Sequence, residues 1–93
     1  MLNVYGYDDE DAAVARANAL SASFQAAVFT RDVERAMRLS RRLDAAAVMV
    51  NDHTAFRVDW MPFGGRRTSG LGVGGMLYAM EDMAPEKLVV IKG

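Results

Sequence analysis

Apolar runs of strand length alternate with helical segments in the first half of the sequence, and this alternation restricts the fold more than any other feature. The runs cover residues 2–5, 24–30 and 45–50, and helical patterns fill the two intervals between them. Because strands that alternate with helices form parallel sheets, the sequence predicts a β-α-β-α-β parallel core of the α/β class. The second and third runs are continuously apolar, which predicts strands buried on both faces.

Acidic residues mark the start of both expected helices. Residues 8–11 supply an N-cap and a negative first turn for a helix that runs to about Leu20, and Asp32 caps the second helix. Glu34 and Arg38 form an i,i+4 pair, so the arginines of the second helix indicate a solvated face rather than a nucleic-acid surface. The side chains expected to form the buried stripe of the second helix are Val33, Ala36, Met37, Ser40 and Leu43.

The second half of the sequence loses this regularity. Residues 51–61 are polar and aromatic without a period, and residues 62–75 hold six of the eight glycines. A long irregular stretch in a short domain is typical of a functional segment. A short helix is expected over residues 73–83, closed by Pro85, and a last strand over residues 88–91. That strand has no obvious partner within the chain, so we expect self-association into a dimer or a larger assembly through it.

Composition excludes several classes of function. With 93 residues the chain is one small domain at most. Its net charge of −1 gives no overall electrostatic attraction to nucleic acid or to a membrane surface. The sequence has no cysteine, which excludes a disulfide framework, a thiolate metal site and a cysteine nucleophile on this chain. There is no apolar run of roughly eighteen residues and no signal-peptide pattern. These features fit a cytoplasmic protein.

The glycine segment from Gly70 to Gly75 formally satisfies the G-x-G-x-x-G pattern of dinucleotide-binding loops. That fingerprint requires a buried strand before it and an acidic residue at the end of the next strand. The residues before it, 66–69, are not a buried strand, and the final strand ends without an acid. We therefore interpret the segment as a loop in which backbone approaches backbone closely.

His53 is the only histidine, and Asp52 precedes it. Adjacent side chains on an extended chain point to opposite sides, so Asp52 is not expected to orient His53. No second histidine or cysteine is present for a metal site, and no nucleophile-elbow pattern surrounds Ser69. A pocket-lining or structural role for His53 is favoured over hydrolytic catalysis. Arg66 and Arg67 follow a glycine pair and are candidates for contact with an anion.

A chain-long pattern resembles the aldehyde dehydrogenase family. Val50-Asn51, a spacer of ten residues and then Pro62-Phe63-Gly64-Gly65-Arg66-Arg67-Thr68-Ser69-Gly70-Leu71-Gly72 resemble the C-terminal signature of the NAD(P)-dependent enzymes. The order upstream is similar as well, with Ala-Ala-Val-Phe-Thr before Arg-Asp and an arginine-rich helix. Residues 51–61 resemble the branch of lactaldehyde, phospho-aldehyde and non-phosphorylating glyceraldehyde-phosphate dehydrogenases.

The resemblance implies that residues 1–72 are a partial catalytic, thiol-bearing domain and that residues 73–93 are a C-terminal helix and oligomerisation strand. In the family, the nucleophilic cysteine, the base glutamate, the oxyanion asparagine and the nucleotide-binding domain lie upstream, and Asn51 is not that asparagine. We therefore expect no catalytic, cofactor-binding or metal-binding residue here, with NAD or NADP bound only by the complete protein. The side chains implied to line the pocket for a small aldehyde are Phe56, His53, Thr54, Arg57, Trp60, Pro62 and Phe63.

Of these side chains, Arg57 would suit an aldehyde with an anionic tail. The expected function is that of a C-terminal fragment of an aldehyde dehydrogenase, inactive alone. The alternative is a stand-alone α/β interaction or regulatory module that assembles through its sheet edges.

Overall fold

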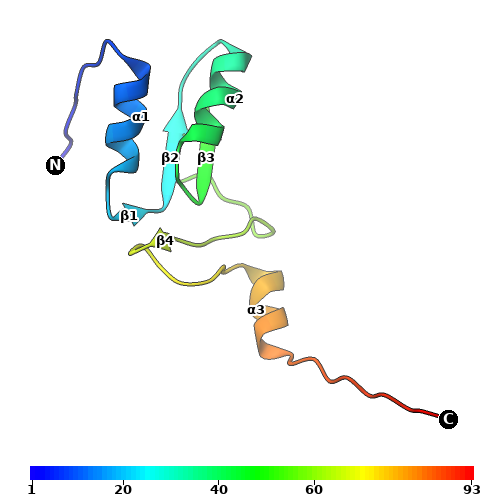
Figure 1. Ribbon diagram of the computed structural model, residues 1–93. Coiled ribbons are helices and arrows are strands. Elements are labelled where there is room, and N and C mark those ends of the chain that lie inside the picture. Colours follow the sequence, from blue (N-terminus) through cyan, green and yellow to red (C-terminus); the bar gives the residue numbers. More distant parts are fainter.

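The computed structural model describes residues 1–93 as an elongated α/β chain (Figure 1). Its extents are 68 × 29 × 25 Å and its radius of gyration is 18.2 Å. A compact domain of this length would have a radius of gyration of about 12 Å. The elements in chain order are α1 (Glu10–Asn18), β1 (Ala22–Ser23), β2 (Gln25–Val28), α2 (Val33–Arg42), β3 (Ala47–Val50), β4 (Arg66–Arg67) and α3 (Met76–Met83).

Aspartates cap the first two helices, as the sequence predicts. The side chain of Asp9 accepts a hydrogen bond from the Asp11 amide at 3.0 Å, at the start of α1. The side chain of Asp32 accepts one from the Arg35 amide at 3.1 Å, at the start of α2. Each cap satisfies an amide that has no partner within its helix. The third helix, which begins at Met76, has Gly75 at its N-cap and therefore no side-chain cap.

Strands β2 and β3 form the predicted parallel pair, joined through α2. Their register runs from Gln25 opposite Ala47 to Val28 opposite Val50. A second, short pair was not predicted: β1 and β4 are antiparallel, with Ala22 opposite Arg67. This pair brings the glycine-rich half of the chain against the start of β2 (Figure 1).

Two predicted strands are not formed. Residues 2–5 and 88–91 form no strand. The C-terminal segment extends away from the body of the molecule (Figure 1). Leu2 and Leu88 are each 87 % exposed. A strand is stabilised by its ladder partner, and neither segment has one in this chain. The parallel core of this chain is therefore one β-α-β unit with α1 beside it, not β-α-β-α-β.

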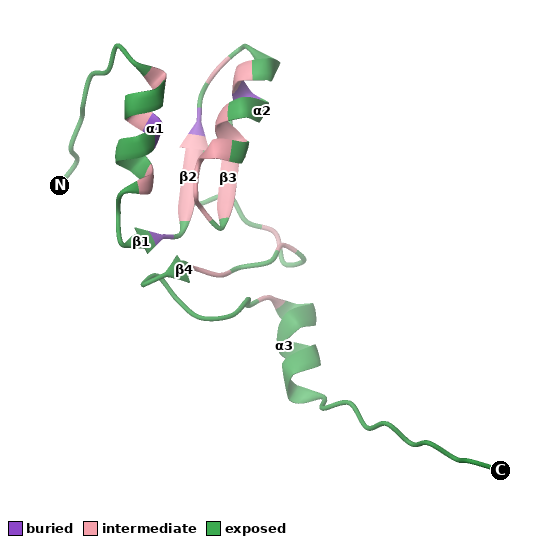
Figure 2. Cartoon of the chain, in the orientation of Figure 1, coloured by how far each residue is buried: buried purple, intermediate pink, exposed green.

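The core is thin, and the prediction of strands buried on both faces is wrong for this chain (Figure 2). Only three apolar residues are buried, Val14, Val28 and Ala36. The rest of β2 and β3 is partly or fully exposed, because α1 and α2 are the only helices packed near these strands.

The buried stripe of α2 is also rotated from the prediction. Val33 and Met37 are 75 % and 49 % exposed, whereas Leu39 faces the crevice between α1, β2 and α2. The inward face thus follows Ala36, Leu39, Ser40 and Leu43, an i, i+3, i+4, i+7 series. No helix in the chain has both the length and the apolar character needed to span a membrane.

Candidate substrate-pocket segment

The residues that the sequence assigns to a substrate pocket do not converge in this chain. Phe56 and Trp60 are 45 % and 74 % exposed. Only Pro62 and Phe63 line an open cavity, of about 260 Å³, between the glycine-rich segment and the starts of β2 and β3. The remaining predicted pocket residues, His53, Thr54, Phe56, Arg57 and Trp60, are outside its lining. Of the predicted pocket residues, therefore, only Pro62 and Phe63 meet at one cavity.

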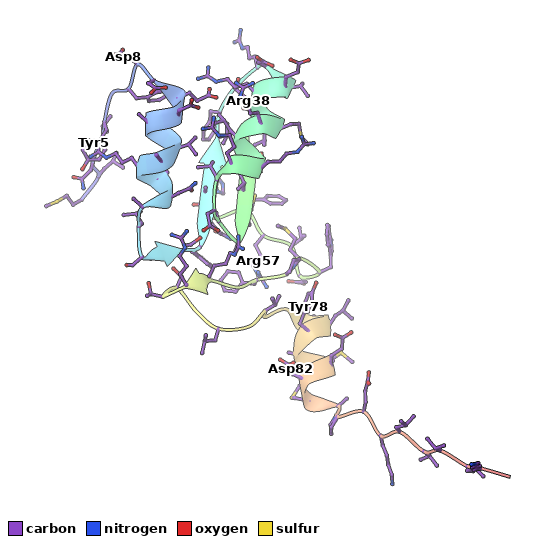
Figure 3. The ribbon with its side chains drawn as sticks, in the orientation of Figure 1. Tyr5, Asp8, Arg38, Arg57, Tyr78 and Asp82 are labelled. Atoms are coloured by element: carbon purple, nitrogen blue, oxygen red, sulfur yellow. The ribbon has the colours of Figure 1, made fainter.

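Phe63 is the best-anchored member of this set. Its ring meets that of Phe24 edge-on, with centroids 5.1 Å apart and planes at 86°. The Arg57 guanidinium lies 4.4 Å from the centroid of the Phe63 ring. Edge-to-face rings and a cation over an aromatic face are both favourable arrangements. Arg57 lies beside this cluster, between the strands and α3 (Figure 3).

Asp52 and His53 are closer than the sequence predicts. The chain turns here, with Asn51 at a φ of 58°, so the extended backbone assumed in that prediction is not present. His53 Nε2 lies 3.8 Å from Asp52 Oδ1, beyond hydrogen-bond distance. His53 Nδ1 instead accepts a hydrogen bond from the Ala55 amide at 3.1 Å, and Asp52 Oδ1 accepts one from the His53 amide at 2.7 Å. Both contacts stabilise the turn, which is a structural role.

Asn51 joins the ends of β2 and β3. Its Oδ1 accepts a hydrogen bond from the Thr30 amide at 2.8 Å, and its Nδ2 donates to the Thr30 carbonyl at 2.9 Å. Its own amide donates to the Val28 carbonyl at 2.8 Å. The side-chain amide thus continues the β2–β3 ladder one step past the last strand residue. Beyond this point the backbone turns into residues 52–61. Sequence reasoning identified Asn51 as a motif residue but not this role.

Close backbone packing explains the glycines. A Cβ atom added to Gly64 would lie 2.7 Å from the Gly72 carbonyl oxygen, closer than real Cβ contacts. Phe63 and Gly74 are paired in an antiparallel bridge beside this contact. The segment before Gly70 is the two-residue strand β4, which is exposed. In this segment the backbone approaches other backbone closely, which agrees with the loop expected from the sequence.

Arg66 and Arg67 bind a carboxylate of the chain itself. Arg66 Nη1 donates to Asp44 Oδ1 at 2.8 Å, and Arg67 Nη2 donates to Asp44 Oδ2. Nearby, the Ser69 hydroxyl accepts a hydrogen bond from the Ser23 amide at 2.9 Å. Asp44 and Ser23 were not identified from the sequence, because nothing local marks them as partners of a segment more than twenty residues away. No group of three or more histidine, cysteine, aspartate or glutamate side chains is placed to hold a metal ion.

A second ion-pair network joins α1 to α2. Glu10 accepts hydrogen bonds from Arg35 Nε at 2.7 Å and from Arg38 Nε at 3.2 Å. Arg42 reaches Asp11 at 2.7 Å. Partial burial raises the pKa of the Glu10 carboxyl, but the hydrogen bonds and charges of Arg38 and Arg35 outweigh burial and hold that pKa below its usual value. The network ties α1 to α2.

The sequence matches a known protein family and several of its members. Residues 1–89 match the aldehyde dehydrogenase family. The chain is 39 % identical over 85 residues to 3-sulfolactaldehyde dehydrogenase of Priestia aryabhattai, covering 91 % of the chain and 18 % of that protein. It is 40 % identical over 91 residues to lactaldehyde dehydrogenase of Methanococcus maripaludis, covering 98 % and 20 %. The chain thus spans about a fifth of the length of these relatives.

Solved structures agree with the sequence comparison. The crystal structure of NADP-dependent glyceraldehyde-3-phosphate dehydrogenase from Bacillus halodurans, complexed with NADP, matches with a TM-score of 0.82 and 32 % identity, over 87 % of this chain and 17 % of that one. The corresponding enzyme from Methanocaldococcus jannaschii, also with NADP, matches with a TM-score of 0.75 and 39 % identity, over 81 % and 16 %. The chain therefore belongs to the aldehyde dehydrogenase family.

Proposed function

We propose that this chain is the C-terminal segment of an aldehyde dehydrogenase and that it supplies scaffold and one short wall of the substrate pocket without catalysing the reaction alone. The observation that carries the proposal is the combination of an assembled signature loop (defined here as residues 62–75) with the absence of any cysteine. Aldehyde oxidation in this family is expected to need a thiolate nucleophile, and this chain has none.

The cofactor would be bound by other parts of the complete protein. NAD or NADP accepts a hydride when bound, and the chain's only glycine-rich segment is filled by its own backbone contacts, such as Gly64 against Gly72. This chain contributes the placement of side chains beside the cavity. The Phe63 ring packs edge-to-face with the Phe24 ring, and Pro62 and Phe63 line an open cavity.

The substrate of the complete protein is proposed to be a small aldehyde with a polar or anionic tail. Arg57 is the only arginine or lysine within residues 51–61, and its guanidinium lies over the Phe63 ring. A guanidinium at this position suits a carboxylate, sulfonate or phosphate. Relatives that act on lactaldehyde, sulfolactaldehyde and glyceraldehyde 3-phosphate support this choice.

The experiment is a turnover assay on the purified chain. Small aldehydes with NAD or NADP should give no reduced cofactor above the buffer control. Cofactor reduction that persists in constant ratio to the chain through repeated purification would overturn the proposal of inactivity. Sequencing the DNA upstream of Met1 is the matching genetic test, since an in-frame segment with a cysteine is expected there. The stand-alone module is not favoured, because the family match extends over residues 1–89.

A further inference from the structure

Asp44 lies in the short connection between α2 and β3, and both of its carboxylate oxygens are engaged. One accepts from Arg66 at 2.8 Å and the other accepts from Arg67. The Asp44 side chain is 31 % exposed, so the pairs are only partly screened by water. A single carboxylate therefore pairs with both adjacent cations of β4 and offsets one of their two positive charges.

Arg67 extends this contact to the end of α1. Its Nη1 atom donates to the carbonyl oxygens of Asn18 at 2.9 Å and Leu20 at 2.7 Å. The last carbonyls of a helix lack partners within the helix, and a cation at this end is favourable. Arg67 also adopts a φ of 56°, a strained conformation for an arginine. The strain persists because the surrounding contacts hold the residue in place.

The backbone of Asp44 is fixed from the other side. Its amide donates to Asn18 Oδ1 at 2.9 Å, and its carbonyl accepts from the Ser23 hydroxyl. The Asn18 side chain also donates to the Arg42 carbonyl at 2.8 Å, at the end of α2. Asp44 is thus an anchored anion, held by α1 and β1, that presents its two oxygens to the signature loop.

We propose that Asp44 is a positioning residue for the signature loop: it holds Arg66 and Arg67 against the ends of α1 and β1 and so seats Phe63 on Phe24. The anion that the motif arginines bind is then internal, and no external anion is needed to explain them. This inference concerns the seating of the loop and is independent of the proposed enzymatic function.

The test compares the full 93-residue chain with Asp44→Asn, Asp44→Glu and the control Asp82→Asn. Asp82 is an exposed carboxylate on α3, labelled in Figure 3, so its substitution removes the same charge away from the loop. Nuclear Overhauser contacts between the rings of Phe24 and Phe63 report the seating of the loop. Hydrogen exchange of the Thr68 and Ser69 amides, which bond Ser21 and Arg66, reports its local opening.

In Asp44→Asn we expect the ring contacts to be lost and the Thr68 and Ser69 amides to exchange on the order of tenfold faster, the effect of losing one charged hydrogen-bond network. The β2–β3 amide of Asn51 should keep its protection. Asp44→Glu should retain part of the ring contacts, and Asp82→Asn should behave as the unmodified chain.

Three results would overturn the proposal. The first is an unchanged loop in Asp44→Asn. The second is an Asp44→Glu chain that is as open as Asp44→Asn, because charge would then not be the cause. The third is an equal loss of protection at Asn51, which would make Asp44 a residue of general stability rather than of loop position.

Discussion

Replacing Asn51 with alanine tests the role of the amide that joins β2 to β3. The substitution removes two hydrogen bonds to Thr30, of 2.8 and 2.9 Å. It also places an alanine at a backbone φ of 58°. The Asn51 amide still donates to Val28, so the strand pair itself remains. The loss is confined to the exit of β3 and to the start of the pocket segment.

The expected magnitude follows from these two terms. A left-handed backbone conformation costs a non-glycine residue about 1–2 kcal/mol. Asparagine adopts this conformation at a lower cost than alanine does. Each exposed hydrogen bond contributes roughly 0.5–1 kcal/mol. Together the loss is about 2–4 kcal/mol, out of roughly 5 kcal/mol expected for a chain of this length with a thin core. The substitution should therefore remove about half of the free energy of unfolding.

Urea unfolding followed by far-ultraviolet circular dichroism measures this loss. Asn51→Gly is the matched control, because glycine adopts the positive φ freely while lacking the amide. We expect its free energy of unfolding to lie about 1 kcal/mol above that of Asn51→Ala. An Asn51→Ala chain with the midpoint of the unmodified protein would refute the reasoning, as would a glycine variant no more stable than the alanine variant.

Three further predictions concern separate parts of the chain. The pKa of Glu10 is lowered in the folded chain, so its stability contribution should be lost as pH falls from the ordinary carboxyl pKa, about 4.3, through the lower folded pKa. Glu10→Gln should therefore flatten the acid titration of ellipticity, and identical titrations would contradict this. Gly64→Ala should destabilise by about 1–3 kcal/mol because its Cβ meets Gly72, whereas Gly6→Ala, in open space, should leave the urea midpoint unchanged. Light scattering should show a dimer or larger species that Val90→Lys reduces, and a monomer at every concentration would contradict association through residues 88–91.

Local signals were sufficient to predict part of this fold. The caps at Asp9 and Asp32 and the parallel β2–β3 pair follow from residues close in sequence. Residues 2–5 and 88–91 have the composition of strands, but a strand forms only where another chain segment supplies hydrogen bonds. The helical spacing of apolar residues in α2 was predicted correctly, but the face that is buried was not. Val33 and Met37 are as apolar as the residues that face inward, so the sequence does not distinguish the two faces.

The candidate site was less predictable. The pocket residues came from a family resemblance, and the chain assembles only the part around Pro62 and Phe63. Asp44 could not be predicted, since its partner Arg67 is 23 residues away and no period or motif links them. The turn at Asn51 is accompanied by hydrogen bonds from its side chain to Thr30, 21 residues away, which become evident only in three dimensions.

The central claim, that this chain is a catalytically incomplete segment of an aldehyde dehydrogenase, is tested most directly by a graft. The chain would replace the 85-residue segment it matches in the 3-sulfolactaldehyde dehydrogenase of Priestia aryabhattai, and aldehyde-dependent formation of reduced cofactor would be measured for the chimera and for the isolated chain. Turnover by the chimera and none by the isolated chain is the predicted result. A folded chimera that binds cofactor but produces no acid, or an isolated chain that turns over, would contradict the account.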